Sequence, residues 1–269
     1  KGIAINKIPI RKASELFGII NIVFFSPEDL NIIKNGPGER RRFIDLELSQ
    51  LDKVYLNNLS NYNRIVNQRN HLLKEIDYNK GALETLDIWD IQLIQYGNKI
   101  IERRQKFIEE INKIISNIHK KLTGNREDIK IVYEPSNGAL SFEQALLKNK
   151  EKDLRIKSTS VGPHRDDIAF LVSDIDIRKY GSQGQQRTAA LSLKLSEIEL
   201  VKQSIHDTPV LLLDDVLSEL DKHRQNYLLD SIHDIQTLIT CTGVDEFVNH
   251  RFSINKVFYV QNGQVTKEN

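Results

Sequence analysis

The segment PVLLLDDVLSELD, residues 209–221, decides the fold class of this chain. Its four consecutive aliphatic residues, at positions 210–213, show no polar alternation. Such a run is typical of a short strand that is buried on both faces, as strands are in a parallel sheet. Further strand-like runs at residues 19–25, 166–172 and 235–242, mixed with helical patterns, predict an α/β fold with a mixed or parallel sheet.

Two carboxylates follow this strand. Asp214 and Asp215 stand at its C-terminal end, which is where open α/β sheets bind their ligands. The first is suited to a metal-bound water and the second to orienting an attacking water, which is the Walker B layout of phosphoryl-transfer enzymes. A strand that ends in an acidic turn with no chemical role is the alternative, because acidic residues are common in turns.

The segment KYGSQGQQRTAALSLKLSEIEL, residues 179–200, precedes that strand. Leu191, Leu193 and Leu195 alternate with Ser and Lys as in a strand, but the length of the run and its Ala, Lys and Glu content favour a helix. The turn at Ser182 then lies at a helix N-terminus, where free N–H groups attract an anion and Gly184 lets a phosphate approach closely. An ordinary N-cap on a core helix is the alternative.

The segments GSQGQQR, LLLDD and SELD follow one another in the order of the signature helix, Walker B strand and D-loop of ABC-type ATPases. Over nearly its whole length the chain resembles the RecF family of bacterial recombination and repair ATPases, relatives of the Rad50 and SMC heads. The resemblance rests on SPEDLNIIKNGPGERRRFID (26–45), YNRIVNQRNHLLKE (62–75), TSVGPHRDD (159–167), KYGSQGQQRTAALSLKLSE (179–197) and VLLLDDVLSELDKHRQNYLL (210–229).

The resemblance implies a Rad50-like ABC-ATPase head with an inserted, mainly helical lobe that contains a short antiparallel helix pair. Residues 1–26 and 126–269 would belong to the head, and residues 27–125 would form the lobe. Apolar stripes at helical spacing over about 59–76 and 101–122 predict the two helices, and Gly124 ends the second. The Asn-Gly pair at 262–263 predicts a closing hairpin.

The same resemblance implies an ATP-dependent DNA clamp of recombinational repair. Such a protein binds ATP and Mg²⁺ between the protomers of an ATP-dependent homodimer, and it binds double-stranded DNA or a single-strand/double-strand junction. It would work in the cytoplasm as a slow DNA-dependent ATPase and help RecR and RecO to load RecA at single-strand gaps. Two alternatives are another SMC or Rad50-type head, which the short helices argue against, and a non-catalytic partner-binding module.

The resemblance also assigns roles to residues. Asp214 would serve Mg²⁺ through a water, and Asp215 would serve the attacking water. The residues that would contact the partner's ATP in trans are Ser182, Gln183, Gly184, Gln185, Gln186 and Arg187. The D-loop across the dimer would be Ser218, Glu219, Leu220 and Asp221, and Thr242 lies near the place of a switch histidine.

The chain departs from the ABC pattern in three places. No G-x-x-x-x-G-K-[ST] occurs in the 269 residues, and the resemblance implies that this P-loop lies upstream of Lys1. The chain by itself would then hold only the trans half of the ATP site and would be inactive. No Gln follows residues 19–25 as a Q-loop would, and Asp215 replaces the usual Glu, so we expect slow hydrolysis.

Basic residues gather on the predicted helices. Guanidinium groups match the geometry of phosphates, so these residues are candidates for a DNA surface. A solvated helix face with ordinary i,i+4 partners is the alternative. The candidates are Arg40, Arg41, Arg42, Arg64, Arg69, Arg103, Arg104, Lys120 and Lys121.

The motif GPHRDD has no role assigned by the resemblance. It comprises Pro163, His164, Arg165, Asp166 and Asp167 after a glycine. Its spacing is too tight for a helix-borne metal pair and a fourth ligand is missing nearby, which disfavours a metal site. We expect a turn held by pairs between Arg165 and the aspartates, near the nucleotide or the DNA.

Composition limits the other possibilities. The formal net charge is +1, so any DNA-binding surface must be a local one. Cys241 is the single cysteine, which excludes an internal disulfide and fits a reducing compartment. No aliphatic run is long enough to span a bilayer, and the start does not resemble a secretion signal, so no membrane partner is expected.

Overall fold

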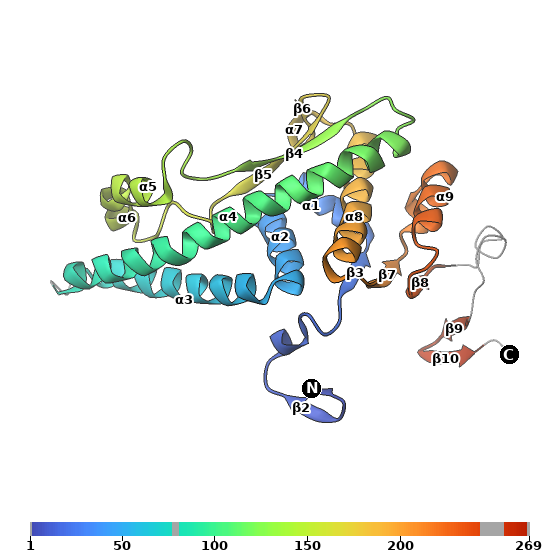
Figure 1. Ribbon diagram of the computed structural model, residues 1–269, viewed down its shortest axis with the longest axis horizontal. Coiled ribbons are helices and arrows are strands. Elements are labelled where there is room, and N and C mark those ends of the chain that lie inside the picture. Colours follow the sequence, from blue (N-terminus) through green and yellow to red (C-terminus); the bar gives the residue numbers. More distant parts are fainter. Residues whose placement is uncertain (1, 77–80, 243–255, 268–269) are drawn as a thin grey trace.

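Figure 1 shows the computed structural model of the chain, which describes residues 2–76, 81–242 and 256–267. No helix within these ranges is long and apolar enough to cross a membrane. The strands are β1 (Ile3–Ile5), β2 (Ile8–Ile10), β3 (Ile22–Phe25), β4 (Ile129–Glu134), β5 (Asp167–Val172), β6 (Ile175–Asp176), β7 (Val210–Asp214), β8 (Thr237–Thr240), β9 (Phe258–Gln261) and β10 (Gln264–Lys267). The helices are α1 (Leu30–Lys34), α2 (Pro37–Leu51), α3 (Lys53–Glu75), α4 (Ala82–Leu122), α5 (Phe142–Lys148), α6 (Lys150–Ile156), α7 (Ile177–Tyr180), α8 (Gln183–Ile205) and α9 (Lys222–Ser231), with short 3-10 turns η1 (Ala13–Leu16), η2 (Pro27–Asp29) and η3 (Leu217–Glu219).

A parallel sheet carries the carboxylate pair. Its order is β3-β7-β8, so the strand that ends in Asp214 lies in the middle. Leu211 and Leu213 of β7 are buried, as expected for a strand covered by other elements. The prediction of a parallel strand at residues 210–213 is therefore confirmed. β3 begins at Ile22 rather than at position 19, because the chain at Ile19 is still turning after η1.

Helix α8 lies between two hydrophobic cores. Leu191, Leu195 and Ile198 pack in the core of the parallel sheet. Ala189, Ala190, Leu193 and Leu200 belong to the other core, together with the long helices and the antiparallel sheet. Burial on both sides explains the strand-like alternation of leucines in this helix, since almost every position from 188 to 201 is buried.

The long antiparallel pair is α3 and α4, which run back along each other (Figure 1). α3 contains nearly all of its predicted range but begins at Lys53, before position 59, and Gly124 follows the end of α4 with a positive φ of 62°. α4 starts at Ala82, well before the predicted position near 101. Gly97 lies inside α4, where a larger residue would not fit. An added Cβ would come within 2.4 Å of the Phe142 ring. A close approach between α4 and α5 thus requires a glycine in the middle of a helix.

An antiparallel sheet, ordered β4-β5-β6, packs against α4. The helical segment after β4 divides into α5 and α6 at Asn149, whose side-chain amide donates to the carbonyl of Ala145 at 2.8 Å. β4 and β5 share their hydrophobic core with α2, α3 and α4. The division of the chain at residues 26 and 125 stays a prediction.

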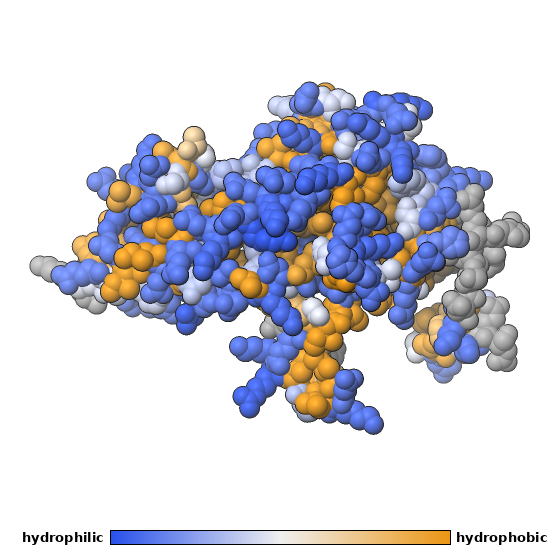
Figure 2. Space-filling view, viewed as in Figure 1, coloured by the Kyte–Doolittle hydropathy of each residue, from blue (hydrophilic) through white to orange (hydrophobic). Residues whose placement is uncertain are grey.

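Two hairpins stand near the chain ends. β1 pairs with β2, and β9 pairs with β10 around the Asn262-Gly263 turn, as the sequence predicted. Figure 2 shows mostly hydrophilic side chains on the face in view, with apolar atoms on the N-terminal segment, where Ile3 and Ile8 are exposed.

Candidate functional site

The carboxylate pair is held by the neighbouring strand. Thr240 of β8 lies opposite Asp214 in the register, and its hydroxyl donates to Asp214 Oδ1 at 2.6 Å. The backbone N–H of Asp215 donates to Thr240 Oγ1 at 3.2 Å. Asp215 adopts a positive φ of 51°, and its Oδ1 is buried with no hydrogen-bond partner among the described residues. Asp214 is thus fixed by Thr240 and exposed, and Asp215 next to it has an oxygen without a hydrogen-bond partner among the described residues.

Thr240 was missed by the sequence analysis, which named Thr242 as the switch position. Thr242 is exposed and lies beyond the end of β8. The signal for Thr240 is the strand register, because residues in register on adjacent parallel strands lie side by side. The role proposed for Thr242 stays a prediction.

The signature turn opens helix α8 at its N-terminus. Ser182 Oγ accepts from the backbone N–H of Gln185 at 3.2 Å, and the Gln185 side chain accepts from the N–H of Ser182 at 3.0 Å. This capping box confirms the predicted helix. It also shows that Ser182 acts as an N-cap, as the alternative interpretation expected. Gln183 and Gly184 are exposed, and an added Cβ at Gly184 would meet only Ser182 Oγ, at 3.9 Å. The first turn is therefore capped and still open to a ligand.

Two signature residues face inward instead. Gln186 is buried, and its amide donates to the carbonyl of Ile177 at 2.8 Å. Its burial corrects the expectation that it contacts a partner's nucleotide. Gln185 donates to Glu127 at 2.9 Å, so its side chain connects α8 with the segment between α4 and β4.

The D-loop connects the carboxylates with the signature helix. Ser218 Oγ donates to the carbonyl of Asp215 at 2.8 Å, and Glu219 lies 3.9 Å from Arg187 of α8. Asp221 caps α9 by accepting from the N–H of Arg224 at 3.0 Å. The other D-loop residue, Leu220, packs against the core of the parallel sheet.

Arg224 connects the predicted D-loop with helix α8. It was not among the candidate residues predicted from the sequence. Its guanidinium donates to Asp221 at 2.8 Å and to Thr188 Oγ1 of α8 at 2.7 Å. Arg224 therefore connects α8 directly with the predicted D-loop. Arg224 lies in the first turn of α9, and nothing in the local sequence of α9 indicates its contact with α8.

A buried charge cluster connects α8 with α2 and β3. Lys194 forms an ion pair with Glu197 in the interior and lies over the rings of Phe25 and Phe43. Glu47 of α2 is buried beside them. Burial, and then the charge of Glu197, raises the pKa of the Glu47 carboxyl well above its usual value. This shift favours the neutral, protonated form of Glu47 at the contact between α2 and α8.

Three of the predicted DNA-binding arginines are interior residues. Arg40 pairs with Asp167 at 2.6 Å, Arg69 with Asp90 and Asp153, and Arg104 with Asp45 at 2.7 Å. All three arginines are buried, and this corrects their assignment to a DNA surface. Buried guanidinium groups need carboxylate partners because desolvation of an unpaired charge is costly.

The other basic candidates are accessible to different degrees. Arg103 is paired with Asp52 and Glu110 at 3.3 Å each, and Lys120 lies 3.4 Å from Asp128. Arg41 donates to the carbonyl of Asp166 at 2.7 Å. The remaining candidates, which are exposed, are Arg42, Arg64 and Lys121.

The GPHRDD turn is held, but not by the expected pairs. Arg165 bonds to the carbonyl of Thr159 and to Ser158, so the prediction of Arg165–Asp pairs is wrong. Asp166 instead accepts from Tyr133 and from the N–H of Ser136. Side chains from other elements donate to both aspartates, Tyr133 of β4 to Asp166 and Arg40 of α2 to Asp167.

The other end of the turn is packed against α3 and α4. Gly162 has a φ of 123°, and an added Cβ would come within 2.5 Å of the Tyr62 hydroxyl. The carbonyl of Pro163 accepts from Arg104 at 2.6 Å. The motif therefore joins the antiparallel sheet to the long helices. No group of three or more metal-ligating side chains occurs in residues 2–76, 81–242 and 256–267.

His164 is neutral in this turn. Its Nε2 lies 3.1 Å from the carbonyl of Thr159, which can only accept, so Nε2 carries the proton. Its Nδ1 then accepts from the Tyr62 hydroxyl at 2.7 Å. Burial lowers the pKa of His164 to about 4.

Acid should therefore weaken the fold through His164. Between about pH 6.5 and pH 4 the unfolded chain binds a proton that the folded chain does not, so the free energy of unfolding falls as the pH falls. The loss approaches about 3 kcal/mol. Urea unfolding across this window should show the loss in the native sequence and not in the His164→Gln variant. Parallel pH profiles for the two proteins would contradict this account.

Known proteins have similar sequences. The chain is 64% identical over 265 residues to the DNA replication and repair protein RecF of Agathobacter rectalis, covering 98% of this chain and 73% of the relative. It is 65% identical over 271 residues to RecF of Lachnospira eligens, covering 100% and 75%. The chain belongs to the RecF family. No protein-family model matches it.

Solved RecF structures agree with the fold. A chain described as the recombination mediator protein RecF-ATP in the RecFOR pathway superposes with a TM-score of 0.90 at 36% identity, covering 100% of this chain and 73% of that one. A RecF-ATPrS chain gives 0.88 at 37% identity, covering 97% and 71%. The RecF fold, with its parallel sheet and helical region, is therefore confirmed for this chain.

Proposed function

We propose that this RecF-family chain supplies the signature, Walker B and D-loop parts of an ATP-dependent DNA clamp. The observation that carries the proposal is the direct connection of these three parts. Ser218 bonds to Asp215, and Arg224 bonds both to Asp221 and to Thr188 of the signature helix. Structures of RecF with ATP belong to the same fold, which supports a nucleotide at this place.

The residues present fit a magnesium ion held mainly by the nucleotide. Asp214 is an exposed carboxylate fixed by Thr240, and a single carboxylate with waters and phosphates is the usual set for Mg²⁺. The ion would offset the negative charge of the phosphates. Asp214 would bind it through a water. Asp215, with its unpaired Oδ1, would orient the attacking water. Its short side chain fits slow hydrolysis.

The second half of the proposal concerns the partner protomer. In an ATP-dependent homodimer, the first turn of α8 would face the partner's nucleotide, where the N-terminal dipole and the open space at Gly184 favour a phosphate. Gln183 and Arg187 are exposed beside it. The D-loop at Ser218 and Glu219 would lie across the same interface.

DNA would bind to the accessible basic residues, Arg42, Arg64 and Lys121, with Arg41, Arg103 and Lys120 partly engaged elsewhere. Such contacts to phosphates are independent of sequence and weaken with salt. We propose cooperation with RecR and RecO in loading RecA because the chain belongs to the RecF family. The name of the pathway in the solved RecF structures supports it.

Dimer formation tests this proposal. The full-length protein should sediment as a dimer in Mg-ATP and as a monomer without nucleotide. A Ser182→Arg variant should stay monomeric while still binding ATP, because the bulky side chain fills the space at the mouth of α8. Ser204→Arg is the matched control at the other, exposed end of the same helix. Dimerisation of the Ser182→Arg variant at the native affinity would contradict the proposed interface.

A further inference from the structure

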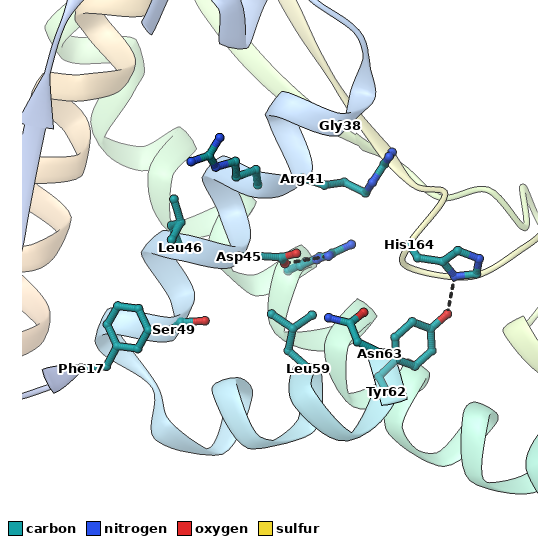
Figure 3. A pocket seen from close by; sticks show the side chains of 12 residues that line it. Phe17, Gly38, Arg41, Asp45, Leu46, Ser49, Leu59, Tyr62, Asn63 and His164 are labelled. Carbon is teal, nitrogen blue, oxygen red and sulfur yellow. Dashed lines mark hydrogen bonds and ion pairs between the residues drawn. The ribbon is translucent and has the colours of Figure 1, made fainter. Parts of the chain in front are cut away.

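A cavity lies away from the residues that are proposed to bind the nucleotide. It has a volume of about 420 Å³ and opens between α2, α3, α4 and the turn at His164 (Figure 3). None of the signature, Walker B or D-loop residues lines it. The side chains that matter for its chemistry are Arg41, Arg42, Asp45, Tyr62, Arg104 and His164.

The cavity carries more positive than negative charge. Arg41 donates to the backbone carbonyl of Asp166 and not to a carboxylate, so this contact does not neutralise its charge. The side chain of Arg42 has no ion pair within the described part of the chain. Asp45 is the single acidic residue of the lining, and His164 is neutral. Three guanidinium groups therefore face one carboxylate.

Asp45 is already committed to other partners. It accepts from Arg104 at 2.7 Å and from the hydroxyl of Tyr55 as well. The Arg104 guanidinium also donates to Tyr55 and to the carbonyl of Pro163, so it is fixed at the base of the cavity. Burial, and then the charge of Arg104, lowers the pKa of Arg41. An anion in the cavity would relieve this repulsion.

The remaining donors are available to an anion. Each guanidinium group has five N–H donors, and Arg41 uses one of them here. Figure 3 shows Arg41, Asn63, Tyr62 and His164 around the same space. Tyr62 gives its proton to His164, which leaves the arginines and the Asn63 amide as donors. Planar forks of this kind bind phosphate oxygens in pairs.

We propose that this cavity binds a phosphate group through Arg41 and Arg42, with Arg104 at its base. The phosphate comes either from a nucleic-acid strand or from a free phosphate compound. In the first case the inference rests on the DNA binding proposed above. In the second case it is independent of that function.

Equilibrium dialysis of the full-length protein with radiolabelled inorganic phosphate, at low ionic strength, tests the site. The Arg41→Gln/Arg42→Gln variant should bind phosphate about tenfold more weakly, because two charge-assisted contacts are lost. Arg42→Gln alone, at an exposed position, should retain the fold and lose part of the affinity. Arg155→Gln, on the exposed surface of α6, is the control and should bind normally.

A saturating non-hydrolysable ATP analogue separates this cavity from the nucleotide site. Phosphate binding that persists with the analogue supports the cavity, whereas displacement by the analogue places the ion at the nucleotide site and overturns the proposal. Absence of binding to the native protein, or equal binding by the double variant, also overturns it. Competition between inorganic phosphate and a DNA duplex, lost in the double variant, identifies a strand phosphate. Phosphate binding without such competition identifies a free compound.

Discussion

Replacing Asp214 with asparagine is expected to lower the rate of ATP hydrolysis about 100-fold or more, with little change in ATP affinity. The asparagine keeps the size of the side chain and one oxygen for the Thr240 hydroxyl. It removes the negative charge that would hold the ion and its waters. Binding energy from the nucleotide's other contacts would remain, so the loss should appear in kcat.

The measurement is steady-state phosphate release by the full-length protein with DNA present, together with nucleotide binding by calorimetry. Asp234→Asn is a suitable control, since Asp234 is exposed and lies in the connection that follows α9. A hydrolysis rate close to the native one in Asp214→Asn would remove this residue from the proposed chemistry.

The second large effect concerns stability. Replacing Asp153 with alanine should lower the free energy of unfolding by about 3–5 kcal/mol, the usual cost of breaking a buried ion pair. Asp153 and Arg69 both have 0% side-chain exposure, and they lie 2.7 Å apart. Asp153 also accepts from the N–H of Ser160 at 3.0 Å. Asp90 would remain as a partner of Arg69, but at the edge of the cluster.

Chemical denaturation of the native protein and of Asp153→Ala gives this difference. Glu151→Ala is the control, because Glu151 is exposed on the same helix, α6. A loss below about 1 kcal/mol, in the range of a surface pair, would show that the Arg69 charge is compensated by Asp90 or by water.

The secondary structure near the site was predictable because its signals are local. The aliphatic run at 210–213 and the Asn-Gly pair at 262–263 identified β7 and the last hairpin. Helix α8 was recognised from its length and composition even though its leucines alternate. Those leucines alternate because the helix is buried on both sides, which is a property of the tertiary structure.

The burial of the predicted DNA-binding arginines depends on ion-pair partners that are distant in the sequence. Arg69 and Arg104 interrupt apolar stripes in the sequence, and that position is a sign of burial that the DNA-surface hypothesis overlooked. Their partners Asp153 and Asp45 lie 84 and 59 positions away, so the pairs do not follow from local spacing. Thr240 and Arg224 escaped notice for the same reason, since each acts on a residue from another element.

The measurement that tests the central claim most directly mixes two inactive full-length variants. Ser182→Ala removes the hydroxyl of the signature turn without filling the interface, and Asp214→Asn removes the charge of the carboxylate site. If the signature acts on the partner's nucleotide, each mixed dimer contains one site with both parts intact. An equal mixture should then recover about a quarter of the native hydrolysis rate, because half of the dimers are mixed. If the signature acts within its own protomer, no site is restored. A mixture as inactive as its two components would contradict the proposed trans site.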